Sequence, residues 1–112
     1  MPPPEEPLTP AVFHVLLALG EGPLHGYGIM QAVEGTSGMA MGPGTVYGTL
    51  RRLAEAGRVE EVVPPAEETD PRRRYFKLTV EGRRALRAEA SRIAELAELV
   101  RARRWAPVRG EG

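Results

Sequence analysis

The chain has 112 residues, with 15 basic and 15 acidic side chains and a formal net charge of zero. This length fits one domain, and the absence of cysteine excludes disulfides, thiolate metal sites and a cysteine nucleophile. No apolar run approaches the ~20 residues of a transmembrane helix, and the first six residues lack the charged and apolar regions of a signal peptide. We therefore expect a cytoplasmic domain with no membrane partner.

The charges are unevenly distributed along the chain. Residues 1–70 carry three arginines against ten acidic residues, a net charge of −7, whereas residues 71–112 carry twelve basic residues against five acidic ones, a net charge of +7. The neutral total therefore excludes only a uniformly basic protein, and a local basic surface that binds nucleic acid stays compatible with it.

The first half of the chain predicts three helices. Residues 1–8 are rich in Pro and Glu, which is typical of a disordered segment. A hydroxyl cap followed by proline at 9–10 starts the first helix, which ends at 20–23. A second helix is expected over 25–34, and a third runs from Pro43 to Gly57.

The second half predicts a hairpin and a long helix. Residues 58–63 and 74–79 are short segments separated by Pro64-Pro65 and a polar stretch, which indicates a hairpin with a charged tip. A final helix follows over 80–105, and 106–112 form a flexible tail. This order predicts a mainly α fold with a small β-hairpin, namely a winged helix-turn-helix DNA-binding domain over 9–79 followed by a long C-terminal dimerisation helix.

The third helix carries polar side chains suited to a DNA groove. Short side chains and glycines near its start allow a close approach of the backbone, while its arginines can reach phosphates or guanine edges and its tyrosine hydroxyl can donate to a phosphate. The candidate contacts are Thr45, Tyr47, Thr49, Arg51 and Arg52. Taken alone, this pattern fits an ordinary amphipathic helix with a solvated outer face equally well.

The expected hairpin tip is the stronger indication of DNA binding. Seven basic residues lie within 72–87 against a single acid, Glu81. The candidates for phosphate contact are Arg72, Arg73, Arg74 and Lys77. The alternative is a solvated charge run paired with Glu67 and Glu68 across the turn, and the position in a wing favours phosphate contact.

The last helix predicts self-association. Apolar residues recur at intervals of 4, 3, 4 and 3, which makes a heptad seam longer than one domain needs. The seam residues are Leu86, Ala90, Ile93, Ala97 and Val100. Pairing in a two-fold symmetric homodimer is the simplest solution, and packing of part of the seam on the chain's own first helix is the alternative.

The sequence offers no catalytic or metal-binding constellation. It has two histidines, His14 and His25, one aspartate and no clustered carboxylates. We therefore expect a protein that is not an enzyme and that holds no metal and no cofactor.

Three stretches of the chain carry a resemblance to a known family. They are Gly22-Pro23-Leu24-His25-Gly26-Tyr27-Gly28-Ile29; Gly42-Pro43-Gly44-Thr45-Val46-Tyr47-Gly48-Thr49-Leu50-Arg51-Arg52-Leu53 running on to Gly57; and Arg72-Arg73-Arg74-Tyr75-Phe76-Lys77-Leu78-Thr79 with Gly82. Their order and spacing, over roughly residues 8 to 90, resemble the PadR-like transcriptional regulators. The length resembles the short subgroup with a single dimerisation helix.

The resemblance implies a dimeric winged-helix repressor, often of a nearby transporter or detoxification gene. It implies that Thr45, Tyr47, Arg51 and the 72–74 wing approach DNA, and that Tyr27 lies near the DNA backbone. One departure is Gly28, where an acidic residue is common.

The resemblance also suggests an effector, since some members bind flat aromatic molecules between their subunits. The candidate residues here are Val12, Phe13, Val100 and Trp105. The alternative for Trp105 is that it merely covers a helix end.

Two functions from different classes follow. The leading hypothesis is a homodimeric repressor that binds an inverted repeat with half-sites about 10–10.5 bp apart or a multiple and is released by a small-molecule effector. The alternative is a winged-helix protein-interaction module without DNA binding. The arginines and threonines expected on the outside of the third helix argue against that alternative.

Overall fold

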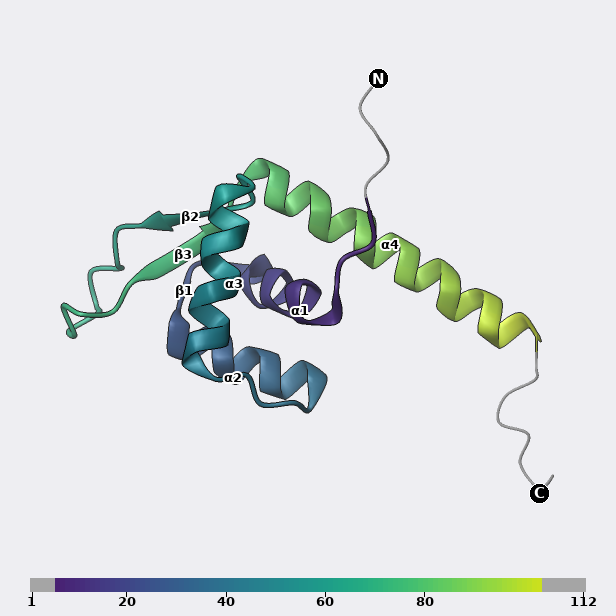
Figure 1. Ribbon diagram of the computed structural model, residues 1–112, viewed down its shortest axis with the longest axis horizontal. Helices are drawn as coiled ribbons and strands as arrows, with labels where there is room; N and C mark the ends of the chain where they lie inside the picture. The colour runs from purple at the N-terminus through teal and green to yellow at the C-terminus, as the bar shows by residue number, and fades with distance from the viewer. Residues whose placement is uncertain (1–5, 104–112) are drawn as a thin grey trace.

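The computed structural model describes residues 6–103, and the order of its elements confirms the mainly α arrangement with a hairpin before the last helix (Figure 1). The elements are α1 (Pro10–Ala18), the 3-10 helix η1 (Leu19–Glu21), β1 (Leu24–His25), α2 (Gly26–Ser37), α3 (Pro43–Glu55), β2 (Val59–Val62), β3 (Tyr75–Leu78) and α4 (Val80–Arg103).

The first helix begins as its capping sequence predicts. The Thr9 hydroxyl accepts a hydrogen bond from the backbone N–H of Val12 at 3.2 Å, and Pro10 stands at the first helical position. Leu8, which the sequence assigned to a disordered segment, instead packs against the core, and its N–H donates to Glu89 Oε1 at 3.2 Å. The start of the described chain is therefore tied to α4.

The second helix is longer than predicted. It continues through Gly35 and ends at Gly38, whose φ of 74° is the left-handed conformation that favours glycine. The Ser37 hydroxyl donates to the Val33 carbonyl at 2.7 Å, and the Thr36 hydroxyl lies 3.3 Å from the Ala32 carbonyl. These bonds to the preceding turn keep the polar segment helical.

The hairpin belongs to a three-stranded antiparallel sheet with the order β1-β3-β2. β3 pairs with β2, with Val59 opposite Leu78, and on its other edge with β1, where His25 lies opposite Tyr75. The sequence missed β1, because two residues are too short to show the alternation that identifies a strand. The missed strand matters for function, because its pairing with β3 attaches the start of α2 to the β2–β3 hairpin.

A close contact fixes the hairpin to the start of α4. The Thr79 hydroxyl donates to the Gly57 carbonyl at 2.6 Å and accepts from the Gly82 N–H at 3.0 Å. A Cβ atom on Gly82 would lie 1.9 Å from the Arg58 carbonyl oxygen, so only glycine fits there. Sheet and helix therefore meet in one geometry.

The core lies where the three N-terminal helices meet the sheet and the first turns of α4. Its fully buried side chains include Leu16, Leu19, Ile29 and Leu50. Beyond Glu89 every described residue of α4 is exposed, and the helix extends away from the domain (Figure 1). No helix among the described residues is long and apolar enough to span a membrane.

Candidate nucleic-acid interface

The outer face of α3, which we define as Gly44, Thr45, Gly48, Arg51 and Arg52, is the first part of the candidate interface. Thr45 and both arginines are exposed, as the sequence predicted. Gly44 and Gly48 add no side chain to this face, and a Cβ on Gly48 would meet only the end of the Arg52 side chain at an ordinary contact distance of 3.8 Å. The opposite side of the helix buries Val46, Leu50 and Leu53 in the core, which fixes the direction of the outer face.

Thr49 is not part of that face, and its predicted DNA contact is wrong. The side chain is 1% exposed and lies in the core, where its hydroxyl is 3.4 Å from the Arg52 guanidinium. Four residues separate Thr45 from Thr49, a spacing that shifts a helical position by about 40°. This rotation is enough to move the second threonine below the protein surface.

Tyr47 is half-buried rather than presented on the outer face of α3. Its ring packs edge-on to Phe76 with centroids 6.3 Å apart, and its hydroxyl lies where a side chain on Gly26 would be. Tyr27 at the start of α2 is more accessible, with 57% of its surface exposed. Tyr47 thus joins α3 to α2 and the sheet, and Tyr27 is the tyrosine open to a ligand.

The wing, comprising β2, β3 and the residues between them, carries the second part of the candidate interface. Each of its three consecutive arginines contacts a carboxylate: Arg72 contacts Asp70 at 3.3 Å, Arg73 contacts Glu68 at 3.4 Å and Arg74 contacts Glu61 at 2.9 Å. The charge run is therefore locally compensated, with Glu68 as one partner the sequence anticipated. Lys77 is exposed on β3, opposite Glu60 in the sheet register.

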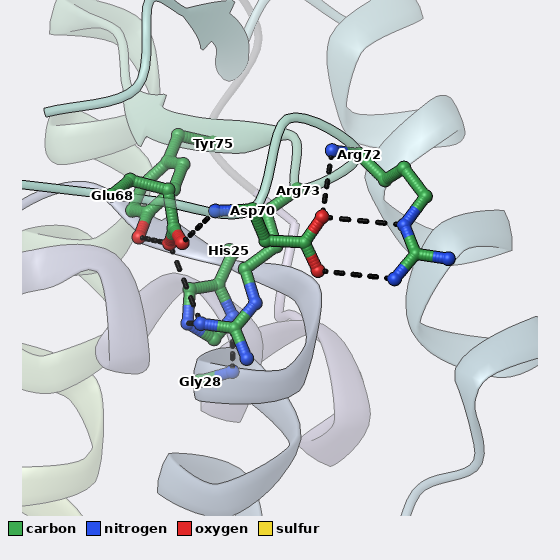
Figure 2. Close-up of polar contacts among 7 residues, drawn as sticks. All are labelled: His25, Gly28, Glu68, Asp70, Arg72, Arg73 and Tyr75. Carbon is green, nitrogen blue, oxygen red and sulfur yellow. Dashed lines mark hydrogen bonds and ion pairs between the residues drawn. The ribbon is translucent and has the colours of Figure 1, made fainter.

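Glu68 is the most constrained of these carboxylates (Figure 2). Its side chain is only 7% exposed, and it accepts hydrogen bonds from the Tyr75 hydroxyl, from the Asp70 N–H at 3.0 Å and from Arg73. The Tyr75 hydroxyl, followed by the Asp70 N–H, lowers the pKa of Glu68 from 4.5 to about 2. Glu68 therefore stays ionised throughout the physiological range.

A groove of about 250 Å³ separates α3 from the wing. Arg51 lines it from the helix, while Arg74 and Glu61 line it from the sheet. The Arg74 guanidinium lies 5.4 Å from the Phe76 ring centroid, a cation–π contact that holds it over the sheet. The outer face of α3 and the wing are therefore neighbouring surfaces, which a single extended polyanion could contact together.

The predicted dimerisation seam divides into two parts. Leu86 is only 9% exposed and belongs to the chain's own core, so its assignment to a free seam is wrong. Ala90, Ile93, Ala97 and Val100 are exposed, and Ile93 and Val100 keep 40% and 47% of their surface accessible. The predicted seam did not include Leu96 and Leu99, both 46% exposed; Leu96 lies beside Ile93 and Val100 on the helix, whereas Leu99 is turned about 100° from Val100.

The predicted effector residues do not line one cavity in the described chain. Val12 and Phe13 are half-buried against the core, Val100 lies on the extended part of α4, and Trp105 lies outside the described residues. An apolar cavity of about 320 Å³ instead lies between the start of α1, the end of α2 and the start of α3. Its lining includes Ala11, His14, Val33, Met39, Met41 and Thr45.

Within residues 6–103, no group of acidic or histidine side chains is arranged to hold a metal ion.

Comparisons with known proteins agree with this geometry. The model of the "Transcriptional regulator PadR-like family" matches residues 15–88. A 37.1 kDa protein in transposon TN4556 of Streptomyces fradiae is 48% identical over 82 residues, which are 73% of this chain and 22% of that protein. The chain thus spans about a fifth of the length of this relative.

Solved structures share the fold. A PadR family transcription regulator from Clostridium difficile R20291 superposes with a TM-score of 0.70 at 21% identity, covering 81% of this chain and 94% of that one. BpsR of Bordetella bronchiseptica, whose DNA binding is regulated by 6-hydroxynicotinic acid, gives 0.66 at 25% identity, covering 86% and 67%. The winged-helix fold with an extended last helix is thereby confirmed, and the chain belongs to the PadR-like family of transcriptional regulators.

Proposed function

We propose that the chain is a homodimeric repressor that inserts the outer face of α3 into the DNA major groove and lays its wing along the sugar–phosphate backbone. The observation that carries the proposal is the exposed face with Thr45, Arg51 and Arg52, whose Arg51 lines a groove together with Arg74 of the wing. Arginine pairs with guanine edges in the major groove, and arginines on the wing suit phosphates.

The exposed apolar residues of α4 support the homodimer. Ile93, Leu96 and Val100 follow one side of the helix over two turns, in the part that leaves the domain. Burying such a stripe against a second copy is the simplest way to remove it from water. A two-fold dimer would also place two α3 helices on successive turns of DNA, which predicts an inverted-repeat operator.

The apolar cavity beside the start of α3 supports release by a small molecule. At about 320 Å³ it has the size of a site for a compact ligand. Thr45 and Met41 line it, so a ligand there would press on the segment that positions the outer face of α3. The effector residues suggested by the sequence remain a second candidate site, which would require the partner's α4 to approach α1.

Selection from a random-sequence duplex library tests DNA recognition directly. The expected product is an enriched inverted repeat with half-sites about 10 bp apart or a multiple, bound by two chains per duplex in sedimentation. An enriched pool without symmetry would contradict the dimeric mode. If no DNA is retained at low salt, the protein-interaction alternative replaces this proposal.

A substitution on α4 tests the dimer separately. Leu96→Glu places a charge in the exposed stripe and is expected to yield monomers of unchanged helicity in sedimentation. Arg101→Glu, which also adds negative charge but lies at a 70% exposed side chain paired with Glu98, is the control and should leave the dimer intact. A variant at Leu96 that remains dimeric would refute this role for the stripe.

6-Hydroxynicotinic acid is the first compound to try for release of bound DNA, because it regulates DNA binding by BpsR.

A further inference from the structure

A cluster of polar and aromatic side chains joins the start of α2 to the loop of the wing, at the point where β3 begins (Figure 2). At its centre is His25, the last residue of β1, whose ring stacks on Tyr27 with an interplanar angle of 9° and meets the Tyr75 ring edge-on at 5.2 Å. These two rings fix the orientation of the imidazole. Both of its nitrogen atoms therefore face defined neighbours.

The two recorded contacts of the His25 ring exclude one another. Nδ1 accepts a hydrogen bond from the Gly28 N–H at 3.1 Å and so caps α2. A neutral imidazole with an accepting Nδ1 carries its proton on Nε2. Nε2 lies 3.4 Å from Nη1 of Arg73, and a guanidinium can only donate. With the helix capped, two N–H donors therefore face each other.

Two donors that converge in this way suit an anionic oxygen placed between them. In the protein without DNA, Arg73 donates one long hydrogen bond of 3.4 Å to Glu68. Glu68 does not depend on that contact, because the Tyr75 hydroxyl and the Asp70 N–H also donate to it. Arg73, which is 44% exposed, could therefore exchange Glu68 for another anion while Glu68 keeps two partners.

We propose that the Arg73 guanidinium and the Nε2–H of His25 form a two-donor site for one phosphate oxygen of the DNA backbone. In the protein without DNA, the ionised Glu68 carboxylate pairs with Arg73 in place of the phosphate. We call the two-donor site the His25–Arg73 site. The inference rests on the proposed function and adds to it a histidine contact and a carboxylate that competes with DNA.

The neighbourhood favours a DNA phosphate over a free anion. Tyr27, stacked on His25, is 57% exposed, and the side chain of Arg72 beside Arg73 is 88% exposed. Two further exposed donors therefore lie close to the His25–Arg73 site, as contact with a continuous backbone requires. Phosphate contacts carry no sequence information, so the site is measurable on a duplex of arbitrary sequence.

His25→Asn separates the capping role from the phosphate contact. Asparagine is a good N-cap residue, so its side chain can replace Nδ1 at Gly28, but it brings no donor to the position of Nε2. We expect a folded protein with a somewhat lower unfolding temperature, because the ring contacts with Tyr27 and Tyr75 are lost, and about tenfold weaker binding to a 30-bp arbitrary duplex at low salt, because one hydrogen bond to a charged group is lost. Thr36→Asn, a polar substitution at an exposed position in the last turn of α2, is the control and should bind normally.

Glu68→Gln tests the competing carboxylate. Glutamine keeps an oxygen that accepts from Tyr75 and Asp70 but removes the charge, so binding should tighten by about threefold or more. Glu67→Gln makes the same change in charge at an exposed neighbour and should have a smaller effect. In an Arg73→Ala background the gain from Glu68→Gln should disappear.

The outcomes separate this inference from the function on which it rests. If the unmodified chain binds the duplex while His25→Asn binds equally well, or if Glu68→Gln and Glu67→Gln act alike, the His25–Arg73 site is refuted and the proposed function stands. If the unmodified chain retains no DNA at low salt, both fall. Competition by free inorganic phosphate at millimolar concentration would instead assign the site to a soluble anion and overturn the DNA-backbone contact.

Discussion

The two arginine-bearing surfaces of this protein differ in what their charges already contact. On the wing, each of the three consecutive arginines has a carboxylate partner at 2.9 to 3.4 Å. On the outer face of α3, neither arginine pairs with a carboxylate of residues 6–103, and the Arg52 guanidinium contacts the Thr49 hydroxyl. The surface with more arginines therefore has the smaller uncompensated charge.

This difference shows that the number of arginines in a segment does not give the number that are free to bind a phosphate, because some are already paired with carboxylates. A compensated arginine must release its carboxylate before it gains a phosphate, so its net contribution to binding is reduced. An uncompensated arginine exchanges only water and counterions. We therefore expect α3 to dominate both affinity and sequence recognition, with the wing adding a smaller contribution that is independent of sequence.

The largest effect should come from removing both arginines of α3. For Arg51→Ala with Arg52→Ala we expect a loss of about 3 kcal/mol of binding free energy on the selected operator, roughly 150-fold, since one good bidentate base contact contributes about 1–3 kcal/mol. The measurement is fluorescence anisotropy with the operator and with an unrelated duplex. The ratio of the two affinities should fall. A uniform loss on both duplexes would assign these arginines to phosphates.

The two threonines of α3 give the next largest contrast. Thr45→Val should weaken operator binding by about 1 kcal/mol, roughly fivefold, and leave unfolding unchanged, because the side chain is exposed. Thr49→Val alters a side chain that is 1% exposed in the core and should leave the DNA contacts of the outer face in place. Urea unfolding and anisotropy on both variants check this. A loss of binding as large as that of Thr45→Val in a well-folded Thr49→Val protein would contradict this contrast, whereas a smaller loss is expected because the Thr49 hydroxyl lies 3.4 Å from the Arg52 guanidinium.

The sequence predicted the elements but not how far each side chain is turned toward the core. Caps, prolines and glycines identified the helices and the hairpin, because these signals are local. The burial of Thr49 and of Leu86 depends on what each helix packs against, which periodicity cannot resolve within one position. Pairing of the wing arginines with Glu68 was anticipated because the two segments flank one turn, whereas the Arg74–Glu61 pair, 13 residues apart, and the two-residue strand β1, which pairs with the distant β3, leave no local signal.

Salt dependence compares the two surfaces in one quantity. Arg51→Ala should lower the slope of log affinity against log salt by about 0.9, the value for one positive charge that neutralises a phosphate and releases its counterions. Arg72→Ala should lower it by less, because Asp70 already compensates that charge. Asp70→Asn retains an oxygen for the Arg72 N–H, which now bonds to Oδ1 at 2.9 Å, and should steepen the slope by freeing the guanidinium. Equal slope changes for Arg51→Ala and Arg72→Ala would remove the distinction between the surfaces.

The smallest expected effect is a pH dependence confined to the wing. The folded wing lowers the pKa of Glu68 from 4.5 to about 2, chiefly through the Tyr75 hydroxyl, so its ionised form stabilises the fold. That contribution is complete above pH 4.5 and is lost as the pH falls from 4.5 toward 2. The free energy of unfolding of wild type should therefore exceed that of Glu68→Gln at neutral pH, and the gap should narrow below pH 4.5. Urea titrations of both proteins at pH 7, 5, 4 and 3 measure it. A gap that stays constant would mean that the ionised form of Glu68 does not stabilise the folded wing.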